Sequence, residues 1–476
     1  MKVKHLVIIP DSVKSKRISA VGLALRLYKA GYRITFVGPG GGYSQIDIFD
    51  YRRVDLRFGQ ETGTPPESYQ KFGKTGLWFW QHQNRCTRQA EVIEAVNTKT
   101  FQSLIEDLSP DLLLIDVEAH PYILSSISQN LPVALFSVFF NLWKRPGVPT
   151  LHSDIVPGKG LAGKPLLIEW QWLRFRLWKW IINKRNFLLS GGMDWLSLLR
   201  CYAESLGLRL EQHVDLYQWL IPFLYQHLPT LVLNPSEMEF PLRQPSGITY
   251  VGPMLCTDRS KLAFLPETEN PLLKLEELLD GYRNGRPDKC LIYCSFGAYF
   301  SGDDIPFLKK LAMAFIGTDW DVIIALGNRV GLNKLGALPE NVLCVGFAPQ
   351  MEILSVSDCA VIHGGMTTVY ECIHYGVPMV LYPFKVNDQL GTAARIQYHQ
   401  LGLVGNRSKD STSKIRERIA KAMGDRLIRN NSERLQQNIS RYTDEKIAAK
   451  SVENIITKYR NSSRSTDSFN RIKRSQ

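Results

Sequence analysis

The chain has 476 residues, of which 44% are apolar and 22% charged, and its 58 Lys and Arg exceed its 45 Asp and Glu to give a net charge of +13. This composition is too apolar for a disordered chain, and the ordinary Gly and Pro content excludes a collagen-like repeat. The length exceeds what one hydrophobic core usually fills, so we expect two lobes of about 200 residues each.

The first half of the chain alternates strand and helix patterns. Residues 3–9 form a short apolar run, residues 22–29 have helical spacing, and residues 34–37 form a second apolar run. A strand, a helix and a strand in this order predict a βαβ unit, whose two strands pair in parallel. The alternation continues with a helix at 101–108 and strands at 112–115, 132–138, 231–233 and 249–251.

A polar stretch rich in Pro and Gly at 257–289 has the composition of a linker. Beyond it the pattern restarts, with strands at 291–295, 322–326, 342–345, 360–362 and 378–381 and a helix at 305–315. We therefore predict an α/β protein of two doubly wound lobes, with a ligand crevice at the carboxyl ends of the strands. The expected division is an N-terminal lobe at 1–253, a linker at 254–289, a C-terminal lobe at 290–445, and a helix with a disordered basic tail at 446–476.

Cysteine spacing and hydropathy indicate the compartment. The eight cysteines are scattered without a Cys-x-x-Cys pair, and no uncharged apolar run reaches 18 residues. The opening apolar run is too short for a signal peptide. Asp319-Trp320-Asp321 precedes a strand instead of following one, which favours a turn over a metal site. A cytoplasmic protein without a metal is expected.

Polar motifs follow strands of the second half. Some begin a helix with small residues, where backbone amides, hydroxyls and the helix dipole favour phosphate oxygens. Others pair an aromatic ring or a carboxylate with an amide, which suits a base, a ribose or a sugar. Each motif alone also fits an ordinary turn, helix cap or core position, so the order of the motifs carries the prediction. The candidate donor-binding residues are Ser295, Gly297, Phe347, Gln350, His363, Gly364, Gly365, Thr367, Thr368, Glu371, Asp388 and Gln389.

Between residues 290 and 405, this order of aromatic-x-Pro-Gln, His-Gly-Gly, Glu and Asp-Gln resembles the donor-binding signature of the UDP-glycosyltransferases, which have the two-lobed GT-B fold. The likeness is weaker at 3–37 and 231–253, and residues 140–230 diverge. It implies that a UDP-sugar binds as co-substrate without a further cofactor. By the same likeness, the uracil lies on Phe347 and Gln350, the ribose on Glu371, the diphosphate near His363, Gly365, Thr368 and Ser295, and the sugar near Asp388 and Gln389. The family usually has Trp in place of Phe347, which leaves the nucleotide preference open.

The catalytic base departs from the family pattern. Inverting members generally place a His after the first strand to deprotonate the acceptor, and an Asp from across the cleft holds that His. Here Lys16 stands at the position of the His, while Asp116 matches the Asp. A protonated Lys is a poor general base unless burial lowers its pKa. Three alternatives remain: Asp116 is the base, Asp11 or His120 has taken the role, or the protein binds a nucleotide sugar without transferring it.

Residues 158–185 are rich in Trp, Lys and Arg and contain a single acidic residue, Glu169. At 100° per residue, the predicted helix carries an apolar stripe. The stripe consists of Leu166, Trp170, Leu173, Leu177, Trp180 and Ile181. Two arrangements are open: the stripe packs on its own lobe and lines an acceptor pocket, or it lies on an anionic membrane surface. Both indicate a lipophilic acceptor. Asn141 and the Pro146-Gly147-Val148-Pro149 run loosely resemble the acceptor half of bacterial hydroxycarotenoid (zeaxanthin) glucosyltransferases.

The sequence therefore predicts an enzyme that transfers a hexose, with inversion, from a UDP-sugar to a hydroxyl of a lipophilic small molecule. A catalytically impaired nucleotide-sugar-binding partner subunit and a sugar-nucleotide epimerase on the same fold are the alternatives. No nucleic-acid recognition motif accompanies the positive charge, so no nucleic-acid partner is expected.

Overall fold

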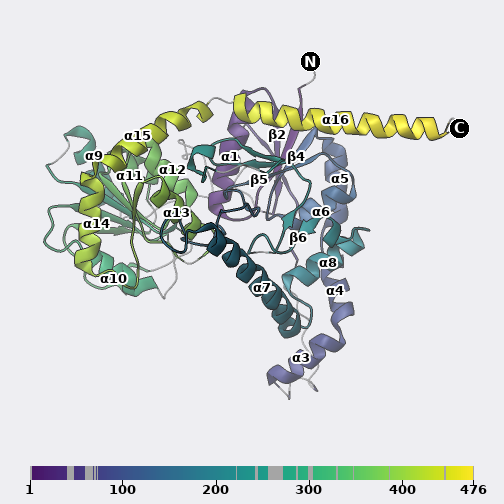
Figure 1. Cartoon of the computed structure of the whole chain (residues 1–476), viewed down its shortest axis with the longest axis horizontal. Coiled ribbons are helices and arrows are strands. Elements are labelled where there is room, and N and C mark those ends of the chain that lie inside the picture. Colours follow the sequence, from purple (N-terminus) through teal and green to yellow (C-terminus); the bar gives the residue numbers. More distant parts are fainter. Residues whose placement is uncertain are drawn as a thin grey trace.

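The computed structural model describes residues 3–39, 48–58, 68, 71, 73–220, 222–241, 245–255, 272–285, 288–297, 304–327, 331–346, 348–384, 386–443 and 446–474. Figure 1 shows two α/β lobes side by side, with helices covering the sheet of each lobe. This arrangement follows from the alternation of strand and helix patterns along the chain.

The N-terminal lobe contains a parallel sheet of seven strands in the order β3-β2-β1-β4-β5-β8-β9. The chain order reverses between β1 and β4, and such a reversal opens a crevice at the carboxyl ends of the two strands. β1, β4 and β5 are buried along their whole length, which explains their continuous apolar runs. The strands are β1 His5–Ile9, β2 Arg33–Gly38, β3 Asp50–Arg53, β4 Leu112–Asp116, β5 Val133–Ser137, β8 Thr230–Val232 and β9 Ile248–Tyr250, and β6 Val214–Asp215 pairs antiparallel with β7 Leu224–Tyr225.

The C-terminal lobe repeats this plan with a parallel six-stranded sheet in the order β12-β11-β10-β13-β14-β15. Its chain order reverses between β10 and β13. The strands are β10 Leu291–Ser295, β11 Asp321–Ala325, β12 Val342–Val345, β13 Cys359–Ile362, β14 Met379–Leu381 and β15 Gly402–Val404. The two doubly wound lobes predicted from the sequence are present.

Helices cover both sheets. Those of the N-terminal lobe are α1 Lys14–Lys29, α3 Gly73–Gln83, α4 Arg85–Glu94, α5 Thr98–Leu108, α6 His120–Ser128, α7 Pro165–Ser190 and α8 Trp195–Ser205. The later helices are α9 Leu272–Asn284, α10 Ile305–Met313, α11 Gln350–Val356, α12 Met366–His374, α13 Gln389–Tyr398, α14 Thr412–Gly424, α15 Arg426–Ser440 and α16 Lys446–Arg474. No helix in the described ranges is long and apolar enough to cross a membrane.

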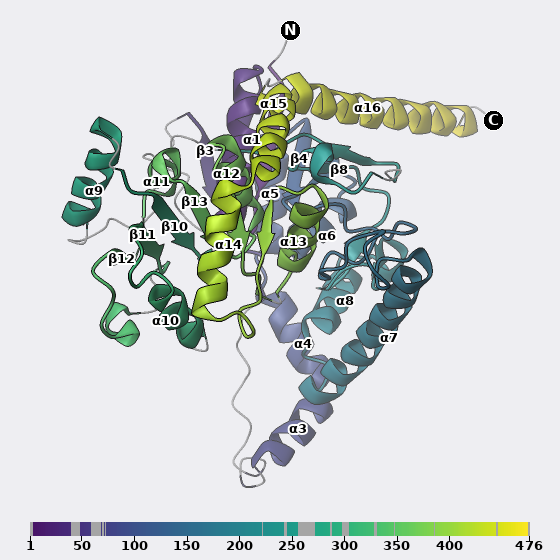
Figure 2. The same ribbon diagram turned by 60° about the vertical axis from the view of Figure 1, so that its left-hand side comes forward.

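Two segments differ from the sequence prediction. The predicted linker contains α9, whose buried Leu275 and Leu279 join the hydrophobic core because they recur at helical spacing. The sequence predicts a helix with a disordered basic tail at 446–476, whereas α16 extends from Lys446 to Arg474. α16 returns to the N-terminal lobe, where Val452 and Ile456 are buried in the same core cluster as residues of α1 (Figures 1 and 2).

Candidate functional site

The predicted diphosphate turn is built around His363, which follows β13. A Cβ atom on Gly297 would lie 2.9 Å from the imidazole, and one on Gly365 would lie 2.6 Å from it, so neither position has room for a side chain. Gly364 has a φ of +92°, a conformation that residues with a Cβ rarely adopt. The three glycines thus allow the backbone to close around the ring immediately before α12 begins.

The imidazole of His363 is buried, and its Nδ1 lies 3.5 Å from the carbonyl oxygen of Ser295. Burial lowers the pKa of His363 to about 4, although the Ser295 carbonyl partly opposes this shift. The ring is therefore neutral at physiological pH. A diphosphate beside it would raise that pKa and favour the charged ring, which donates from both nitrogens.

Four of the predicted donor-binding residues share one buried polar network. The Oε1 atom of Gln350 accepts hydrogen bonds from the hydroxyls of Tyr293 at 3.1 Å and Ser295 at 3.2 Å. Its Nε2 atom donates to the Thr368 hydroxyl at 3.3 Å and to the Glu371 carboxylate. Glu371 is 0% exposed, so it is not a solvated residue on a helix surface. A ribose can reach its carboxylate only when the Gln350 side chain turns away.

The start of α13 carries the residues predicted to hold the sugar. Gln389 is buried, and its Oε1 atom accepts a hydrogen bond from the backbone N–H of Phe384 at 2.8 Å. Burial raises the pKa of Asp388 to about 6; the charge of Glu118 adds to this rise, and that of Lys16 opposes it. Glu118 and Lys16 belong to the N-terminal lobe, so Asp388 lies within electrostatic reach of that lobe.

The remaining predicted donor residues are less well defined. Thr367 is half-buried in the first turn of α12. Phe347, the predicted base-stacking residue, lies outside the described residues.

A buried ion cluster that the sequence did not predict joins α13 to the N-terminal lobe. Arg395 of α13 forms an ion pair with Glu239, and Arg145 lies 3.0 Å from the other oxygen of that carboxylate. The Arg395 guanidinium also lies 4.3 Å from the centre of the Phe140 ring and 4.5 Å from that of Phe240. Because these groups come from distant parts of the sequence, no local pattern could have indicated the cluster.

In the N-terminal lobe, Lys16 lies at the centre of three carboxylates. Its Nζ atom is 2.9 Å from Asp11, 2.5 Å from Glu118 and 3.4 Å from Asp116. Asp11 follows β1 and Asp116 ends β4, the two strands between which the sheet order reverses. The cluster therefore occupies the crevice where open α/β sheets bind their ligands. Glu118 was missed, although it follows Asp116 by only two residues.

The groups of this cluster change one another's pKa values in different directions. Burial would lower the pKa of Lys16, but the three carboxylates raise it well above its ordinary value, so the ammonium group cannot serve as a base. Burial raises the pKa of Asp116 to about 7; Lys16 opposes this rise, and Asp11 and Glu118 add to it. Although burial opposes it, Lys16 lowers the pKa of Asp11. The structure thus gives a near-neutral pKa to the Asp116 carboxylate.

The candidate bases differ in the solvent exposure of their side chains. The Asp116 side chain is 1% exposed, and its Oδ2 atom has no hydrogen-bond partner among the described residues. The side chains of Asp11 and Glu118 are 24% and 26% exposed, so an acceptor meets them first. His120 is buried, with Nδ1 3.3 Å from the Tyr225 hydroxyl, and burial lowers its pKa to about 3. His120 therefore lies in the interior of the lobe.

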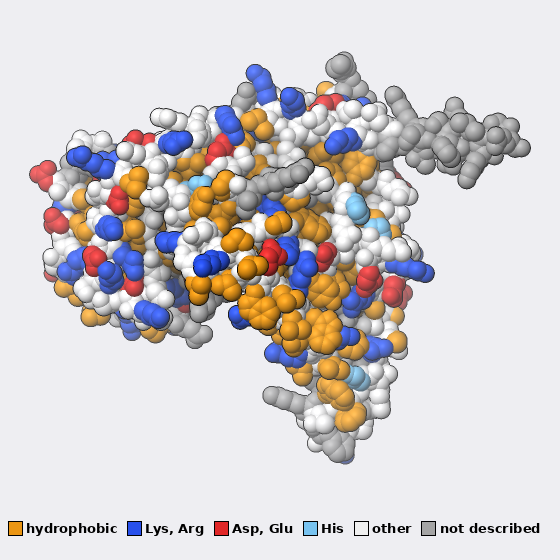
Figure 3. All heavy atoms as spheres, viewed as in Figure 1, with side chains coloured by type: hydrophobic (Ala, Val, Ile, Leu, Met, Phe, Trp, Pro, Cys, Tyr) orange, Lys and Arg blue, Asp and Glu red, His pale blue; other side chains and the backbone are white. Residues whose placement is uncertain are grey.

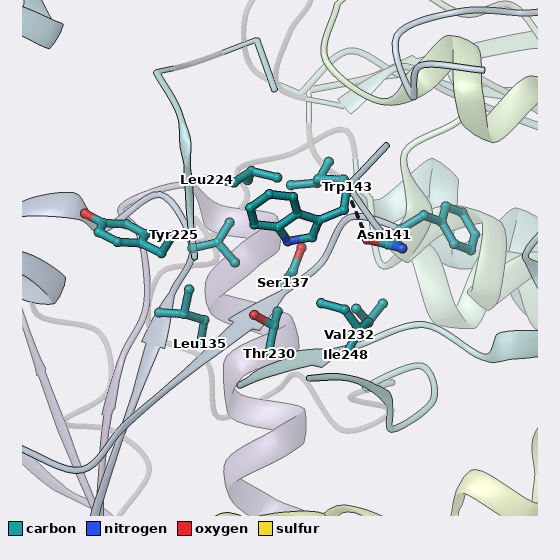
Figure 4. Close-up of a pocket in the computed structure, with 12 residues that line it drawn as sticks. Leu135, Ser137, Asn141, Trp143, Leu224, Tyr225, Thr230, Val232 and Ile248 are labelled. Carbon is teal, nitrogen blue, oxygen red and sulfur yellow. Dashed lines mark hydrogen bonds between the residues drawn. The ribbon is translucent and has the colours of Figure 1, made fainter. Parts of the chain in front are cut away.

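A small cavity lies among β5, β8 and β9 of the N-terminal lobe (Figure 4). Its volume is about 20 Å³, enough for about one water molecule. The lining includes Val117, the residue after Asp116, and is mostly apolar, with Ser137, Thr230 and Asn141 as polar members. Asn141 accepts a hydrogen bond from the backbone N–H of Trp143 at 3.0 Å, while its Nδ2 atom is buried without a partner among the described residues. An acceptor would need this cavity to widen.

The predicted apolar helix is α7, and its orientation tests one of the two arrangements left open by the sequence. Ile168, Trp172 and Phe175 are buried on one side of the helix. The predicted stripe is solvent-exposed, with Leu166 at 84% and Leu173 at 58%. The stripe therefore does not pack on its own lobe, and the arrangement in which it lines a pocket is wrong.

Comparison with known proteins matches the C-terminal lobe most directly. Residues 310–454 match the family model described as erythromycin biosynthesis protein CIII-like, C-terminal domain. The uncharacterized UDP-glucosyltransferase YdhE of Bacillus subtilis is 36% identical over 143 residues, 30% of this chain and 34% of the relative. Demethyllactenocin mycarosyltransferase of Streptomyces fradiae is 31% identical over 177 residues, 37% of each chain. The chain thus matches about a third of the length of these curated relatives.

The whole chain resembles solved glycosyltransferases in fold. The crystal structure of CalG4, the calicheamicin glycosyltransferase, superposes with a TM-score of 0.60 over 96% of this chain and 99% of that chain, at 19% sequence identity. At this identity the likeness concerns the fold alone, and it confirms the GT-B architecture that the sequence predicted.

Proposed function

We propose, from the premise that the chain belongs to the UDP-glycosyltransferase family, that it transfers a hexose from a UDP-sugar to a hydroxyl of a lipophilic small molecule with inversion. One observation carries the proposal. Ser295, Gln350 and Glu371 come after separate strands of the C-terminal lobe and meet in one hydrogen-bonded network, as a donor site requires.

The donor half of the reaction needs stabilisation of the departing UDP. The turn around His363 offers backbone amides, an imidazole and the amino-terminal end of α12 to the diphosphate. Donors that are already in place when negative charge develops lower the barrier without further reorganisation. We propose that these groups perform this task without a metal ion.

The acceptor half needs a base. We propose Asp116, because a carboxylate with a pKa near 7 is about half ionised at neutral pH and takes up a proton readily in its ionised form. The acceptor hydroxyl transfers its proton to Asp116 while its oxygen attacks the anomeric carbon opposite the departing UDP, which inverts that centre. Lys16 stays charged and holds the neighbouring carboxylates. Because Asp116 is buried, its surroundings must rearrange when the acceptor enters.

The transfer step is tested by mass spectrometry of a lipid extract incubated with several UDP-sugars. Asp116→Asn should reduce product formation at least about a hundredfold. Asp11→Asn tests the second candidate base, and Asp107→Asn, at an exposed position of α5, is the matched control. Activity of Asp116→Asn within about threefold of the wild type, with loss in Asp11→Asn, would assign the base to Asp11.

The donor site is tested by calorimetric titration with UDP. Glu371→Gln keeps the shape of the side chain but removes the charge, and we expect at least about a tenfold loss of affinity. Glu352→Gln, at an exposed position of α11, should bind UDP like the wild type. Equal affinity in both variants would remove Glu371 from the donor site.

A second candidate function is a partner subunit that binds a nucleotide sugar without transferring it. The burial of Asp116 and the charged Lys16 in place of a base favour it. UDP binding without product from any acceptor would support this alternative over transfer.

A lipophilic acceptor resides in a membrane, so peripheral contact with an anionic membrane belongs to the same proposal. α7 is the element from which that contact was predicted.

A further inference from the structure

α7 has two apolar faces that point in opposite directions. Ile168, Trp172 and Phe175 pack against the body, and the Trp172 indole donates a hydrogen bond to the carbonyl of Val148 at 2.7 Å. At 100° per residue, the centre of the opposite face lies about 180° from Phe175. We call this opposite face the outer face of α7. Its residues are between 49% and 84% exposed and comprise Leu166, Trp170, Leu173, Leu177, Trp180, Ile181 and Leu188.

The outer face is continuous on the molecular surface. Figure 3 shows hydrophobic side chains gathered along α7, with Lys and Arg side chains beside them. The C-terminal end of the outer face meets α3, where the Trp78 indole donates a hydrogen bond to the carbonyl of Leu188 at 2.7 Å. The neighbouring Phe79 of α3 is exposed as well. Monomeric proteins rarely expose an apolar run of this length unless it contacts another surface.

Cations outnumber anions around the outer face. Arg174 and Arg185 lie about 80–100° from the centre of the face on one side, and Arg176 lies about 80° away on the other. Lys184 projects from the face itself. The single acidic residue of α7, Glu169, is paired with Lys144 at 2.5 Å. A face of Trp and Leu bordered by an excess of cations complements the acyl region and the anionic headgroups of a bilayer.

The helix cannot leave the body to cross a bilayer. Lys179 is buried on the inner side, where it donates a hydrogen bond to the carbonyl of Leu220, and no helix in the described ranges meets the length and hydropathy of a membrane span. A second copy of the chain is a poor occupant, because pairing two outer faces would bring their Arg and Lys residues together.

We propose that the outer face of α7 docks the protein on an anionic bilayer, with the helix lying in the plane of the interface. This inference rests on the proposed function and adds to it the bilayer as the source of the lipophilic acceptor. Docking itself requires neither a sugar donor nor turnover, so it stands or falls by a separate measurement.

The test is co-sedimentation of the full chain with phosphatidylcholine vesicles, with or without phosphatidylglycerol. We expect binding to the vesicles that contain phosphatidylglycerol and weaker binding when salt is added. The double variant Leu173→Glu, Leu177→Glu should lose at least about tenfold in partitioning. Leu427→Glu, on α15 of the other lobe and 51% exposed in the wild type, is the matched control and should bind normally.

Separate variants test the electrostatic contribution to vesicle binding. Arg174→Glu with Arg185→Glu should abolish the preference for phosphatidylglycerol, and Lys421→Glu, on α14, should not. All these positions are exposed, so thermal unfolding should stay at the wild-type temperature. Absence of vesicle binding, equal binding by the double leucine variant, or self-association that the leucine variant removes would each overturn the proposal.

Discussion

Replacement of Asp116 by Asn should change stability and activity in opposite directions. A catalytic carboxylate held in an unfavourable environment costs stability, whereas a carboxylate that only caps a neighbouring turn contributes to it. The Asn side chain has the same shape but cannot ionise. The variant therefore separates the two roles of the residue.

The magnitude follows from the pKa of Asp116, which burial raises from 3.8 to about 7. Between these two values the folded protein binds more protons than the unfolded chain, so stability falls as the pH rises from about 4 to about 7. At about 1.36 kcal/mol per pH unit, stability is lower by about 4 kcal/mol at pH 8 and by about 2 kcal/mol at pH 5 than at a pH below both pKa values. Because the side chain is 1% exposed, solvent does not screen this cost appreciably. The pKa of about 7 for Asp116 already includes the attraction between its carboxylate and Lys16.

We therefore expect Asp116→Asn to raise the free energy of unfolding by up to about 4 kcal/mol at pH 8, and by less at pH 5. Urea unfolding followed by circular dichroism at the two pH values measures the difference. Transfer activity of the same preparation should fall at least about a hundredfold. A variant that is less stable than the wild type at both pH values would refute the reasoning, because it would make Asp116 a structural carboxylate.

Three further predictions concern the same sites. The kcat/KM of the wild type should rise about tenfold between pH 6 and pH 8, since the base must be ionised; a flat profile would exclude a base with a pKa near 7. Lys16→Met removes the charge that lowers the pKa of Asp116, so the rise should move to higher pH, which the same profile measures. Gly365→Ala places a Cβ 2.6 Å from the His363 ring and should weaken UDP binding at least about tenfold by calorimetry. Gly424→Ala, which meets no atom within 4 Å, should leave UDP binding unchanged.

The strands of both sheets can be predicted from the sequence because their burial shows in short, continuous stretches of the chain. The central strands are buried on both faces, so they read as continuous apolar runs and can be located without knowledge of the fold. Parallel strands bring their carboxyl ends to one edge, which is why residues after separate strands could be expected together. Ser295, Gln350 and Glu371 meet in this way.

What the sequence could not give depends on long-range packing. Lys16 and Glu118 are separated by 102 positions, and no spacing rule connects them. The ion pair between Glu239 and Arg395 joins residues 156 positions apart. The buried face of α7 could not be predicted for another reason. The helix has two apolar faces, one with Trp172 and Phe175 and the other the outer face, and periodicity alone does not say which face is buried.

The contacts of α7 join the proposed membrane surface to the proposed sugar site. Trp172 holds the carbonyl of Val148, in the loop that leads to the helix. Three residues further along this loop, the carbonyl oxygen of Leu151 would lie 2.1 Å from a Cβ atom on Gly391, so the loop packs directly on the first turn of α13. Asp388 is the N-cap residue of α13, and its pKa responds to the charges of Glu118 and Lys16. The proposed membrane surface on α7 and the predicted sugar motif at the start of α13 are therefore linked through one loop, residues 148–151.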